Sequence, residues 1–429
     1  MVGRVGMTGM NKNQPRIAVI GAGIAGLSAA YFLRNNAQIT LYEQENRLGG
    51  HSRTIHIQTA YGVIPVDTGF IVFNTRTYPN LLRLFHELAV EIQPSNMSFA
   101  ASTNSGQMEW AGRSINSWFA QRQNILNIPM WRGLVDVIRF NQTAVTITHD
   151  KPEMTVRELL IKLNCGNWFR HHYLLPMVAA IWSCPIDHVL DFPAHFLVQF
   201  MYNHGLLQIY RQPQWLTLKN RSADYVERLV KIAKPTIILS AEITAIKRQA
   251  DSVIIMAANG QNQLVDQVIF ACHPQIVLSL LKDATNKERY VLSKFQRHKN
   301  IAYTHRDPNW MPQRIKCWSS WNYLSTQQNG QTKIAVTYWM NKLQSLPDTK
   351  PVFVTLNPWQ SIANKDILDQ TEFYHPTYNL ETYSAQKDIA AIQGENRCWF
   401  TGAYLGYGFH EDGIKSSLQV IQKMGLSWS

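Results

Sequence analysis

A glycine-rich turn near the start of the chain restricts its possible folds more than any other feature of the sequence. The short apolar run at residues 17–20 is followed at once by Gly21, Gly23 and Gly26, and residues 27–33 then favour a helix. This order predicts a strand, a tight turn and a helix N-terminus, which place backbone N–H groups and the helix dipole against a diphosphate. Gly21 allows the chain to reverse, Gly23 leaves the backbone open to the phosphates, and Gly26 allows the helix to pack on the strand.

An acidic residue at the end of the next predicted strand supports this interpretation. The strand at residues 38–42 ends in Glu43, about 20 residues after the glycines, where a carboxylate can accept hydrogen bonds from both ribose hydroxyls. A glycine motif alone is weak support, because any glycine-rich turn between a strand and a helix can match it. With Glu43 in place, we expect a dinucleotide with a free 2′-OH. The residues predicted to bind it in this segment are Gly21, Ala22, Gly23, Ile24, Ala25, Gly26, Glu43 and Gln44.

The segment after Glu43 carries a family resemblance. Arg47, Gly49, Gly50 and His51 stand in an order that resembles the flavin-containing amine oxidase and phytoene desaturase superfamily, in which an R-x-G-G segment follows the ribose-binding glutamate. The resemblance implies that the dinucleotide is FAD rather than NAD, and that this segment lies beside it. Members commonly have Arg or Lys where this chain has His51, so a side chain that titrates near neutrality replaces a permanent cation near the diphosphate.

Two later segments extend the resemblance to other parts of the cofactor. Residues 63–74 are largely apolar, and a glycine that interrupts a buried strand marks a close approach to its backbone. In the superfamily a similar D-x-G segment runs past the flavin, which implies that Gly69 and Phe70 lie near FAD, whereas Asp67 could equally form a turn. The segment that includes Ile243 matches one that passes the adenine, where the contact comes from the backbone of Ile243.

A second glycine-rich turn lies near the end of the chain. Residues 399–409 read as a strand and a turn, and a final helix follows in which Ile414, Leu418 and Ile421 share one face. The segment resembles the superfamily's C-terminal flavin motif, in which the helix start faces the N1 and C2 carbonyl end of the isoalloxazine and its dipole stabilises negative charge there. Ala403 replaces the family's acidic residue after the first glycine, and Glu411 or Asp412 could substitute for it. The residues that the motif places near the flavin are Gly402, Ala403, Glu411, Asp412, Gly413 and Ile414.

Phe409 and His410 are the predicted catalytic residues. In amine oxidases the position that matches Phe409 is typically a tyrosine, which forms one wall of an aromatic cage around the amine. Phenylalanine keeps the ring and removes the hydroxyl, which favours an apolar substrate such as a fatty acyl chain. His410 could move a proton at the flavin edge, although a histidine at a helix start is also an ordinary structural choice. The dense aromatic residues at 317–323 could line a substrate tunnel or pack the core.

The resemblance covers nearly the full length of the chain. Its segments look like those of a bacterial subgroup of amine-oxidase-like flavoproteins, and related domains are fused to cyclopropane fatty acid synthases in plants. The resemblance implies an FAD-dependent oxidoreductase that moves a hydride from a substrate C–H to flavin N5, on a fatty acyl or other lipid chain. A redox-neutral double-bond isomerase, an amine oxidase and a noncatalytic partner of a lipid-modifying enzyme remain open. The segments are 66–74, 179–185, 192–196, 318–324, 336–344, 354–358 and 406–413.

These patterns predict an α/β protein with a discontinuous Rossmann-like FAD-binding domain and an inserted substrate domain of mixed sheet and helix. We expect the first 14 residues to form a disordered extension, because they have neither an apolar core nor a regular pattern. Residues 95–150 are irregular in pattern and belong to the second domain. The predicted ranges are 15–85, 210–285 and 390–429 for the FAD-binding domain, and 86–209 and 286–389 for the substrate-binding domain.

The charge of the chain favours an anionic partner. The 41 Lys and Arg residues exceed the 29 Asp and Glu residues, which gives a formal net charge of +12. Lipid headgroups attract such a surface, but the basic residues are scattered and contain no run of five, so solvated surface charge explains them equally well. We therefore expect no nucleic-acid partner, and we allow peripheral contact with an anionic membrane.

The cysteine and histidine patterns speak against structural metals and disulfides. The five cysteines contain no C-x-x-C pair, and the adjacent His171 and His172 point to different helix faces rather than to one metal ion. No apolar run reaches the 18 or more residues that a membrane-spanning helix needs. These observations predict a chain without a metal ion, located in the cytoplasm or at the inner face of the membrane.

Overall fold

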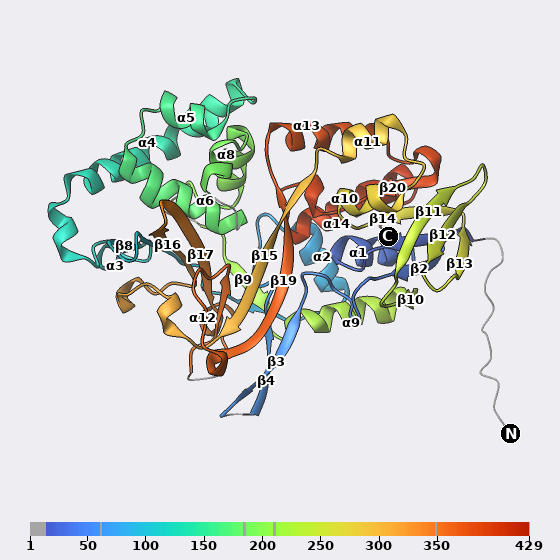
Figure 1. Ribbon diagram of the computed structural model, residues 1–429, viewed down its shortest axis with the longest axis horizontal. Coiled ribbons are helices and arrows are strands. Elements are labelled where there is room, and N and C mark those ends of the chain that lie inside the picture. Colours follow the sequence, from blue (N-terminus) through green and yellow to red (C-terminus); the bar gives the residue numbers. More distant parts are fainter. Residues whose placement is uncertain (1–13, 61, 183–185, 209–211, 348–349, 429) are drawn as a thin grey trace.

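The computed structural model describes residues 14–60, 62–182, 186–208, 212–347 and 350–428. Its helices and strands form two units that lie side by side, with the long strands β15 (Gln296–His305) and β19 (Ile367–Thr377) between them (Figure 1). The predicted N-terminal extension falls almost entirely outside the described residues. Among the described residues, no helix has both the length and the apolar character needed to cross a membrane.

The first unit is built on a parallel five-stranded sheet with strand order β10-β2-β1-β14-β20. Three separate stretches of the chain supply these strands, so the glycine-rich start of the chain and its C-terminal segment belong to one sheet. This arrangement confirms the predicted α/β class with a discontinuous Rossmann-like unit. The strands are β1 (Arg16–Ile20), β2 (Gln38–Tyr42), β10 (Thr236–Ile238), β14 (Gln267–Phe270) and β20 (Cys398–Phe400).

The two faces of this sheet are covered differently. Helices α1 (Ile24–Leu33), α9 (Arg221–Ala233) and α14 (His410–Lys423) pack together on one face around a shared apolar core. An antiparallel meander of β11 (Ile243–Arg248), β12 (Val253–Ala257) and β13 (Asn262–Val265) covers the other face. Gly260 has φ +77° in the turn between β12 and β13, where the sequence predicts a hairpin.

The second unit contains a seven-stranded sheet with order β19-β15-β18-β17-β16-β7-β8. Its strands come from two distant parts of the chain. β7 pairs with β16 in parallel and joins the two parts, whereas the neighbouring strands from β16 to β19 pair in antiparallel fashion. The long strand β19 forms one edge of this sheet, and β15 lies next to it. The remaining strands of this sheet are β7 (Phe99–Thr103), β8 (Met108–Ala111), β16 (Trp321–Gln328), β17 (Gln331–Trp339) and β18 (Phe353–Leu356).

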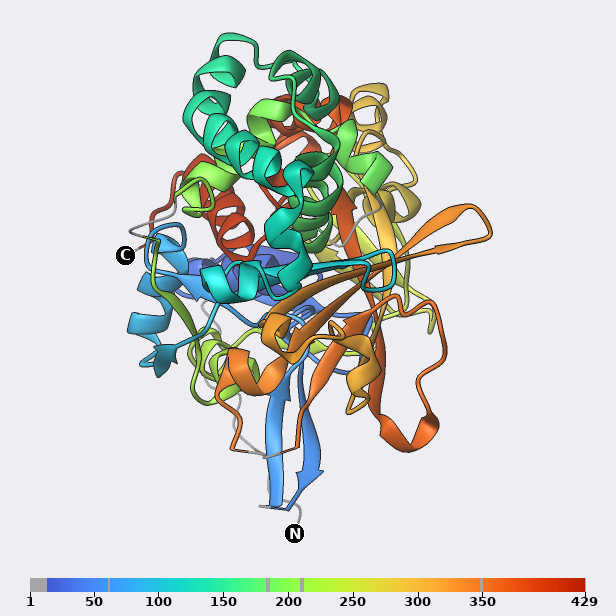
Figure 2. The ribbon, with the colours of Figure 1, turned by 90° about the vertical axis from the view of Figure 1, so that its left-hand side faces the viewer.

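A group of helices packs on this sheet, at the end of the molecule that faces the viewer in Figure 2. Thr155 caps α5 in a capping box with Glu158. The irregular sequence pattern over residues 95–150 conceals a long helix, because α4 occupies 23 of these residues and begins at an Asn127 cap followed by a proline. The helices are α4 (Ile128–Asp150), α5 (Val156–Lys162), the π-helix η2 (Phe169–Leu174), α6 (Leu175–Trp182), α7 (Ile186–Leu190) and α8 (Ala194–Asn203).

Short elements connect the two units. Asp67 is fully buried at the end of β4 and accepts hydrogen bonds from the Ser222 N–H (3.0 Å) and hydroxyl (2.7 Å), so it anchors the start of α9.

The connecting and peripheral strands are β3 (Thr54–Thr59), β4 (Gly62–Asp67), β5 (Phe73–Asn74), β6 (Ile92–Pro94) and β9 (Trp215–Leu218). The other α-helices are α2 (Pro79–Glu87), α3 (Ile115–Trp118), α10 (Pro274–Leu280), α11 (Asn286–Leu292), α12 (Met340–Gln344) and α13 (Leu380–Asp388). The 3₁₀ turns are η1 (Arg122–Leu126), η3 (Pro308–Trp310), η4 (Ile315–Cys317), η5 (Asn364–Asp366), η6 (Ile389–Ala391), η7 (Glu395–Arg397) and η8 (Ala403–Leu405).

Candidate cofactor site

The turn between β1 and α1 has the geometry of a diphosphate cradle. Gly21 has φ +105°, and a Cβ atom there would lie 2.9 Å from the Ala271 carbonyl oxygen. A Cβ on Gly26 would lie 1.9 Å from the Gly21 carbonyl oxygen, so that glycine is needed for helix packing. A Cβ on Gly23 would have no heavy atom within 4 Å. The space above Gly23 is therefore open to a ligand, while the other two glycines are required by the protein itself.

Glu43 is oriented toward this turn. Its carboxylate accepts a hydrogen bond from the Ala22 N–H at 2.7 Å and another from the Glu45 N–H at 2.9 Å. Each carboxylate oxygen has a second lone pair, so Glu43 can still accept hydrogen bonds from ribose hydroxyls. Gln44 follows it in an exposed position of the same loop.

The Arg47–His51 segment lies directly against the glycine turn. The Gly49 N–H donates to the Ala22 carbonyl at 2.9 Å, and a Cβ on Gly50 would lie 3.1 Å from the Gly23 Cα. Arg47 Nη1 donates to the Gly50 carbonyl at 2.9 Å, which stabilises the loop from within. The structure therefore brings the two predicted segments together at one point.

The His51 side chain is half-buried beside this loop. Its ring stacks on Phe373 with centroids 4.9 Å apart, and the His375 ring lies 5.3 Å away. Burial, together with the nearby Arg47 charge, lowers the pKa of His51 to about 4, so the imidazole is neutral at physiological pH. Its Nε2 atom is buried without a hydrogen bond. A buried polar atom of this kind calls for a ligand or a water molecule.

Gly69 and Phe70 contact the same loop. The Phe70 N–H donates to the His51 carbonyl at 2.7 Å, and a Cβ on Gly69 would lie 2.2 Å from that oxygen. Phe70 in turn stacks on His410, with ring centroids 3.7 Å apart. Residues 69–70 thus connect the N-terminal motif with the C-terminal one.

The C-terminal helix begins next to the start of α1. A Cβ on Gly413 would lie 2.8 Å from Cγ2 of Ile24, and the Ser417 hydroxyl donates to the Ala25 carbonyl at 2.7 Å. Gly402 precedes the short turn η8, which begins at Ala403, and Ile414 is fully buried. The positive ends of two helices, α1 and α14, therefore converge from opposite ends of the chain.

The two acidic residues of α14 bind backbone groups. Glu411 accepts hydrogen bonds from the Asn80 N–H (3.1 Å) and the Leu81 N–H (2.9 Å) at the start of α2. Asp412 accepts from the Phe409 N–H at 2.9 Å and caps its own helix, and burial raises its pKa to about 7. Both carboxylates therefore fix helix starts. This role differs from the one considered from the sequence, in which Glu411 or Asp412 substitutes for the acidic residue that Ala403 replaces.

His410 points into the protein core rather than toward the apolar surroundings of Phe409. Its Nε2 lies 2.9 Å from the Ser52 hydroxyl and 3.3 Å from the Tyr225 hydroxyl. Burial lowers the pKa of His410 to about 3, so the ring is neutral in the folded protein. This geometry indicates a residue that positions α14 against Ser52 and α9. Sequence reasoning missed both partners, because neither lies in a motif.

Phe409 packs with aromatic residues of the second unit, and we call this group the aromatic wall. Its ring stacks on Phe200 with centroids 5.2 Å apart, and the tilted Tyr407 ring lies 4.6 Å from the Phe196 ring. The Trp182 indole N–H donates to the Tyr407 carbonyl at 3.0 Å. The spacing of Phe196 and Phe200, four residues apart in an apolar helix, is the sequence signal that could have revealed this wall. The wall consists of Trp182, Phe192, Phe196, Phe200, Tyr378, Tyr407 and Phe409.

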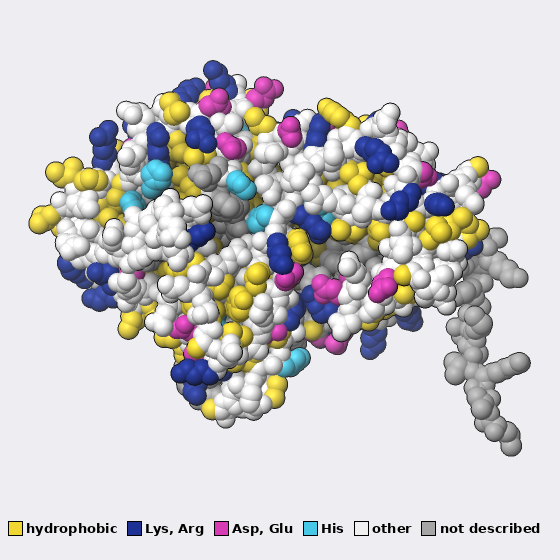
Figure 3. All heavy atoms as spheres, in the orientation of Figure 1, with side chains coloured by type: hydrophobic (Ala, Val, Ile, Leu, Met, Phe, Trp, Pro, Cys, Tyr) yellow, Lys and Arg dark blue, Asp and Glu magenta, His cyan; other side chains and the backbone are white. Residues whose placement is uncertain are grey.

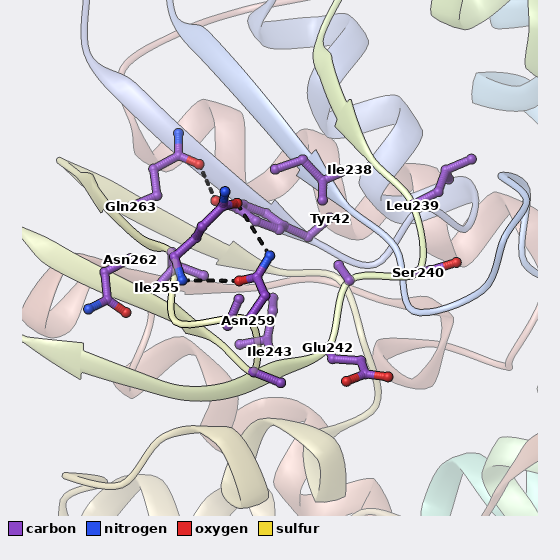
Figure 4. Close-up of a pocket in the computed structure, with 14 residues that line it drawn as sticks. Tyr42, Ile238, Leu239, Ser240, Glu242, Ile243, Ile255, Asn259, Asn262 and Gln263 are labelled. Carbon is purple, nitrogen blue, oxygen red and sulfur yellow. Dashed lines mark hydrogen bonds between the residues drawn. The ribbon is translucent and has the colours of Figure 1, made fainter.

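Ile243 lies at a cavity of ≈ 490 Å³ between the meander and the parallel sheet (Figure 4). The cavity wall begins beside Glu43, whose carbonyl accepts a hydrogen bond from the Ala241 N–H at 2.8 Å. Side-chain amides line part of it. The lining residues are Tyr42, Ile238, Leu239, Ser240, Ala241, Glu242, Ile243, Ile255, Ala257, Ala258, Asn259, Gln261, Asn262 and Gln263.

The described residues contain no group of three or more His, Cys, Asp or Glu side chains arranged to hold a metal ion. His172 Nδ1 lies 2.6 Å from the Thr103 hydroxyl, which gives this histidine a structural contact. Four cysteines in the described part of the chain are free thiols, and Cys184 lies outside it.

Comparison with known proteins supports this fold. Residues 19–88 match the NAD(P)-binding Rossmann-like domain family. A CLA-producing fatty acid isomerase from P. acnes aligns with a TM-score of 0.69 and 15% identity, over 97% of this chain and 99% of that one. A putrescine oxidase with redesigned cofactor binding aligns with a TM-score of 0.67 and 13% identity, over 96% and 99% of the two chains.

A curated relative matches a short part of this chain. Coproporphyrinogen III oxidase of Mycobacterium tuberculosis (strain ATCC 25618 / H37Rv) is 43% identical over 76 residues, which is 17% of this chain and 16% of the relative. The chain therefore combines an NAD(P)-binding Rossmann-like segment at residues 19–88 with an amine-oxidase-like fold over nearly its whole length.

Proposed function

We propose that the protein is an FAD-dependent oxidoreductase that takes a hydride from a substrate C–H, and that its substrate is an apolar molecule such as a fatty acyl chain. The observation that carries the proposal is the convergence of the starts of α1 and α14, which the Ser417–Ala25 hydrogen bond holds together. One helix start suits a diphosphate and the other suits the electron-accepting ring of a flavin.

The residues present fit FAD on three counts. The backbone at Gly23 is open to a ligand, Glu43 faces the glycine turn, and the buried Nε2 of His51 lacks a partner. Arg47, Gly49 and Gly50 would complete the diphosphate side, and the backbone of Ile243 would meet the adenine. When bound, FAD supplies the hydride acceptor that the side chains of the protein lack.

The C-terminal segment would hold and tune the flavin ring. Residues 402–414 would set the positive end of α14 near the flavin, where the helix dipole would stabilise negative charge that develops on reduction. Asp412 and Glu411 keep this helix start in place through their hydrogen bonds to backbone N–H groups. His410, held by Ser52, fixes the side of the segment that faces away from the substrate.

The aromatic wall around Phe409 supports an apolar substrate. Phe409, Phe200 and Phe196 present ring carbons, which bind alkyl chains and exclude water from a hydride transfer. The Tyr378 hydroxyl is the one polar group of this wall that is buried without a hydrogen-bond partner in the described residues. It could donate a hydrogen bond to a carboxyl or ester oxygen at one end of the chain.

A redox-neutral double-bond isomerase is the second candidate function. The similarity in fold to a fatty acid isomerase favours it, because both reactions need an acyl chain held at a flavin. An amine oxidase and a noncatalytic partner of a lipid-modifying enzyme share the fold but find less support in the apolar wall.

Anaerobic mixing distinguishes these functions. The FAD-loaded protein is combined with primary amines and with unsaturated, methyl-branched and cyclopropane acyl lipids, and the flavin absorbance is followed. Lasting bleaching by an acyl lipid supports the oxidoreductase, whereas product without bleaching or an external acceptor supports the isomerase. Rapid bleaching by simple amines with inert lipids would identify an amine oxidase. A preparation that gains no flavin absorbance with FAD would overturn the proposal.

A further inference from the structure

One end of the molecule carries a continuous set of exposed apolar side chains. In α4, Ile128, Trp131, Val135 and Ile138 are exposed and follow each other at intervals of three, four and three residues, so they share one face of the helix. We name this set, with its neighbours in α3, η1 and η4, the apolar end surface. Its members are Ile115, Ile125, Leu126, Ile128, Trp131, Val135, Ile138 and Ile315.

Contacts between the elements hold this surface together. The Trp131 indole N–H donates to the Ile125 carbonyl at 2.8 Å, and the Trp131 ring lies 5.1 Å from Phe119, which follows α3. Helix α3 in turn contacts η4, which carries Ile315. The surface is therefore one feature built from two distant parts of the sequence.

The degree of exposure is unusual for such large apolar residues. Leu126 is 87% exposed, Ile115 81%, Ile128 78% and Ile315 77%. Isolated exposed apolar side chains are normal on soluble proteins, but contiguous ones mark an interaction site. The space-filling view shows hydrophobic side chains gathered at the same end, where Figure 1 places α3 and α4, with Lys and Arg side chains beside them (Figure 3).

The charges around the apolar end surface have one sign. Arg113, Arg122, Arg132 and Lys316 are exposed in or beside its elements. Between residues 110 and 149 the sequence has a single acidic residue, Asp136, which is buried and paired with Arg139. Two copies of this chain that met through this surface would bring these four cations against each other. An anionic partner would neutralise them instead.

We propose that the apolar end surface docks the protein on an anionic lipid bilayer. Helix α4 would lie in the plane of the interface with Ile128, Val135 and Ile138 among the acyl chains, and Arg122 and Arg132 near the headgroups. Trp131 suits this depth, because its ring is apolar and its N–H is already satisfied. Each Lys or Arg near an anionic membrane strengthens binding.

Vesicle flotation tests the apolar part of the proposal. The full chain is mixed with vesicles of phosphatidylcholine alone, or of equal parts of phosphatidylcholine and phosphatidylglycerol. We expect binding to the anionic vesicles, weakened by salt, and we expect the L126E/I128E double variant to lower the partition coefficient about tenfold or more. The matched control L264E changes an exposed leucine of β13, in the other unit, and should bind like the unmodified protein.

A charge-reversal pair tests the electrostatic part. R122E/R132E should reduce binding to the anionic vesicles strongly, whereas K247E in β11 should have little effect. Circular dichroism and FAD titration show that each variant is folded, and neither readout depends on lipid. The flotation result is thus separate from the proposed catalytic function.

Three outcomes would overturn the proposal. The first is equal binding of the L126E/I128E variant and the unmodified chain, and the second is no binding of the unmodified chain to either vesicle. The third is a dimer in solution that L126E/I128E dissociates, without vesicle binding. That result would assign the surface to contact between two copies of the chain.

Discussion

Gly23 is the residue at which cofactor binding can be separated from folding. We predict that Gly23→Val lowers the affinity for FAD by at least about 100-fold, because the new side chain occupies the space above the turn. The free energy of unfolding should change little, since a Cβ there meets no atom within 4 Å. FAD fluorescence titration and urea unfolding measure the two quantities.

Gly112→Val is the matched control. Gly112 is exposed, and the one atom near a Cβ at this position lies 3.9 Å away in the Trp110 ring. This variant should bind FAD like the unmodified protein. Equal FAD affinity of both variants would refute the assignment of the β1–α1 turn as the diphosphate cradle.

At the scale of elements, Glu411 joins the starts of α14 and α2. We predict that Glu411→Ala lowers the free energy of unfolding by about 2 kcal/mol, because it leaves the N–H groups of Asn80 and Leu81 without their acceptor. Urea unfolding measures the change. Glu381→Ala, which removes an exposed glutamate from the first turn of α13, should cost less than about 0.5 kcal/mol. A similar cost for both would show that Glu411 does not support α2.

Elements with local signals could be predicted, and those that depend on distant pairing could not. The strands β1 and β2, the Pro79 start of α2 and the Thr155 cap each follow from a few neighbouring residues. β15 was missed because residues 296–300 are polar, and pairing with β18 and β19 rather than an apolar pattern makes the segment a strand. α4 was missed because part of its apolar face is exposed, which blurred the helical pattern.

The same distinction applies to the candidate site. The glycines of the β1–α1 turn could be predicted, because backbone geometry limits which residue types can stand there. Glu43 could be placed beside this turn, because it ends the neighbouring strand. The Ser52–His410 contact and the aromatic wall could not, since they join residues as far apart as Phe200 and Phe409. The sequence also could not reveal that Glu411 would bind the start of α2.

At the scale of the whole molecule, buried histidines make stability depend on pH. Burial lowers the pKa of a group of histidines far below the value of about 6.5 expected in the unfolded chain. Well above pH 6.5 these histidines are neutral in both the folded and the unfolded state, so they do not lower the free energy of unfolding. As the pH falls toward 4, the unfolded chain takes up protons that the folded protein does not, so stability decreases. The histidines are His51, His172, His204, His273 and His305, with pKa values of about 4, His410, with about 3, and His375, whose pKa lies well below its usual value.

We predict that the FAD-free protein has a clearly lower urea midpoint at pH 5 than at pH 7.5. Each of these histidines contributes at most about 1.4 kcal/mol per pH unit within the window. Asp412 acts in the opposite direction, because its raised pKa of about 7 means that it takes up a proton on folding as the pH falls. Burial also raises the pKa values of Asp67 and Glu411, which act in the same direction as Asp412. These three carboxyls are outnumbered by the histidines, so we expect the histidines to set the sign of the change. A midpoint that stays constant or rises toward pH 5 would contradict the assigned burial.

The hydrogen bond between Ser417 and Ala25 spans 392 residues of sequence. A ribosome that has made the first glycine turn must therefore synthesise almost the entire chain before the second wall of the site exists. Until then the face of α1 that packs against α14 has no partner, and the proposed FAD site has only one of its two helix starts. If FAD binds between these helix starts as we propose, its loading is a late event in the life of the nascent protein, and a chain that ends before α14 would be colourless.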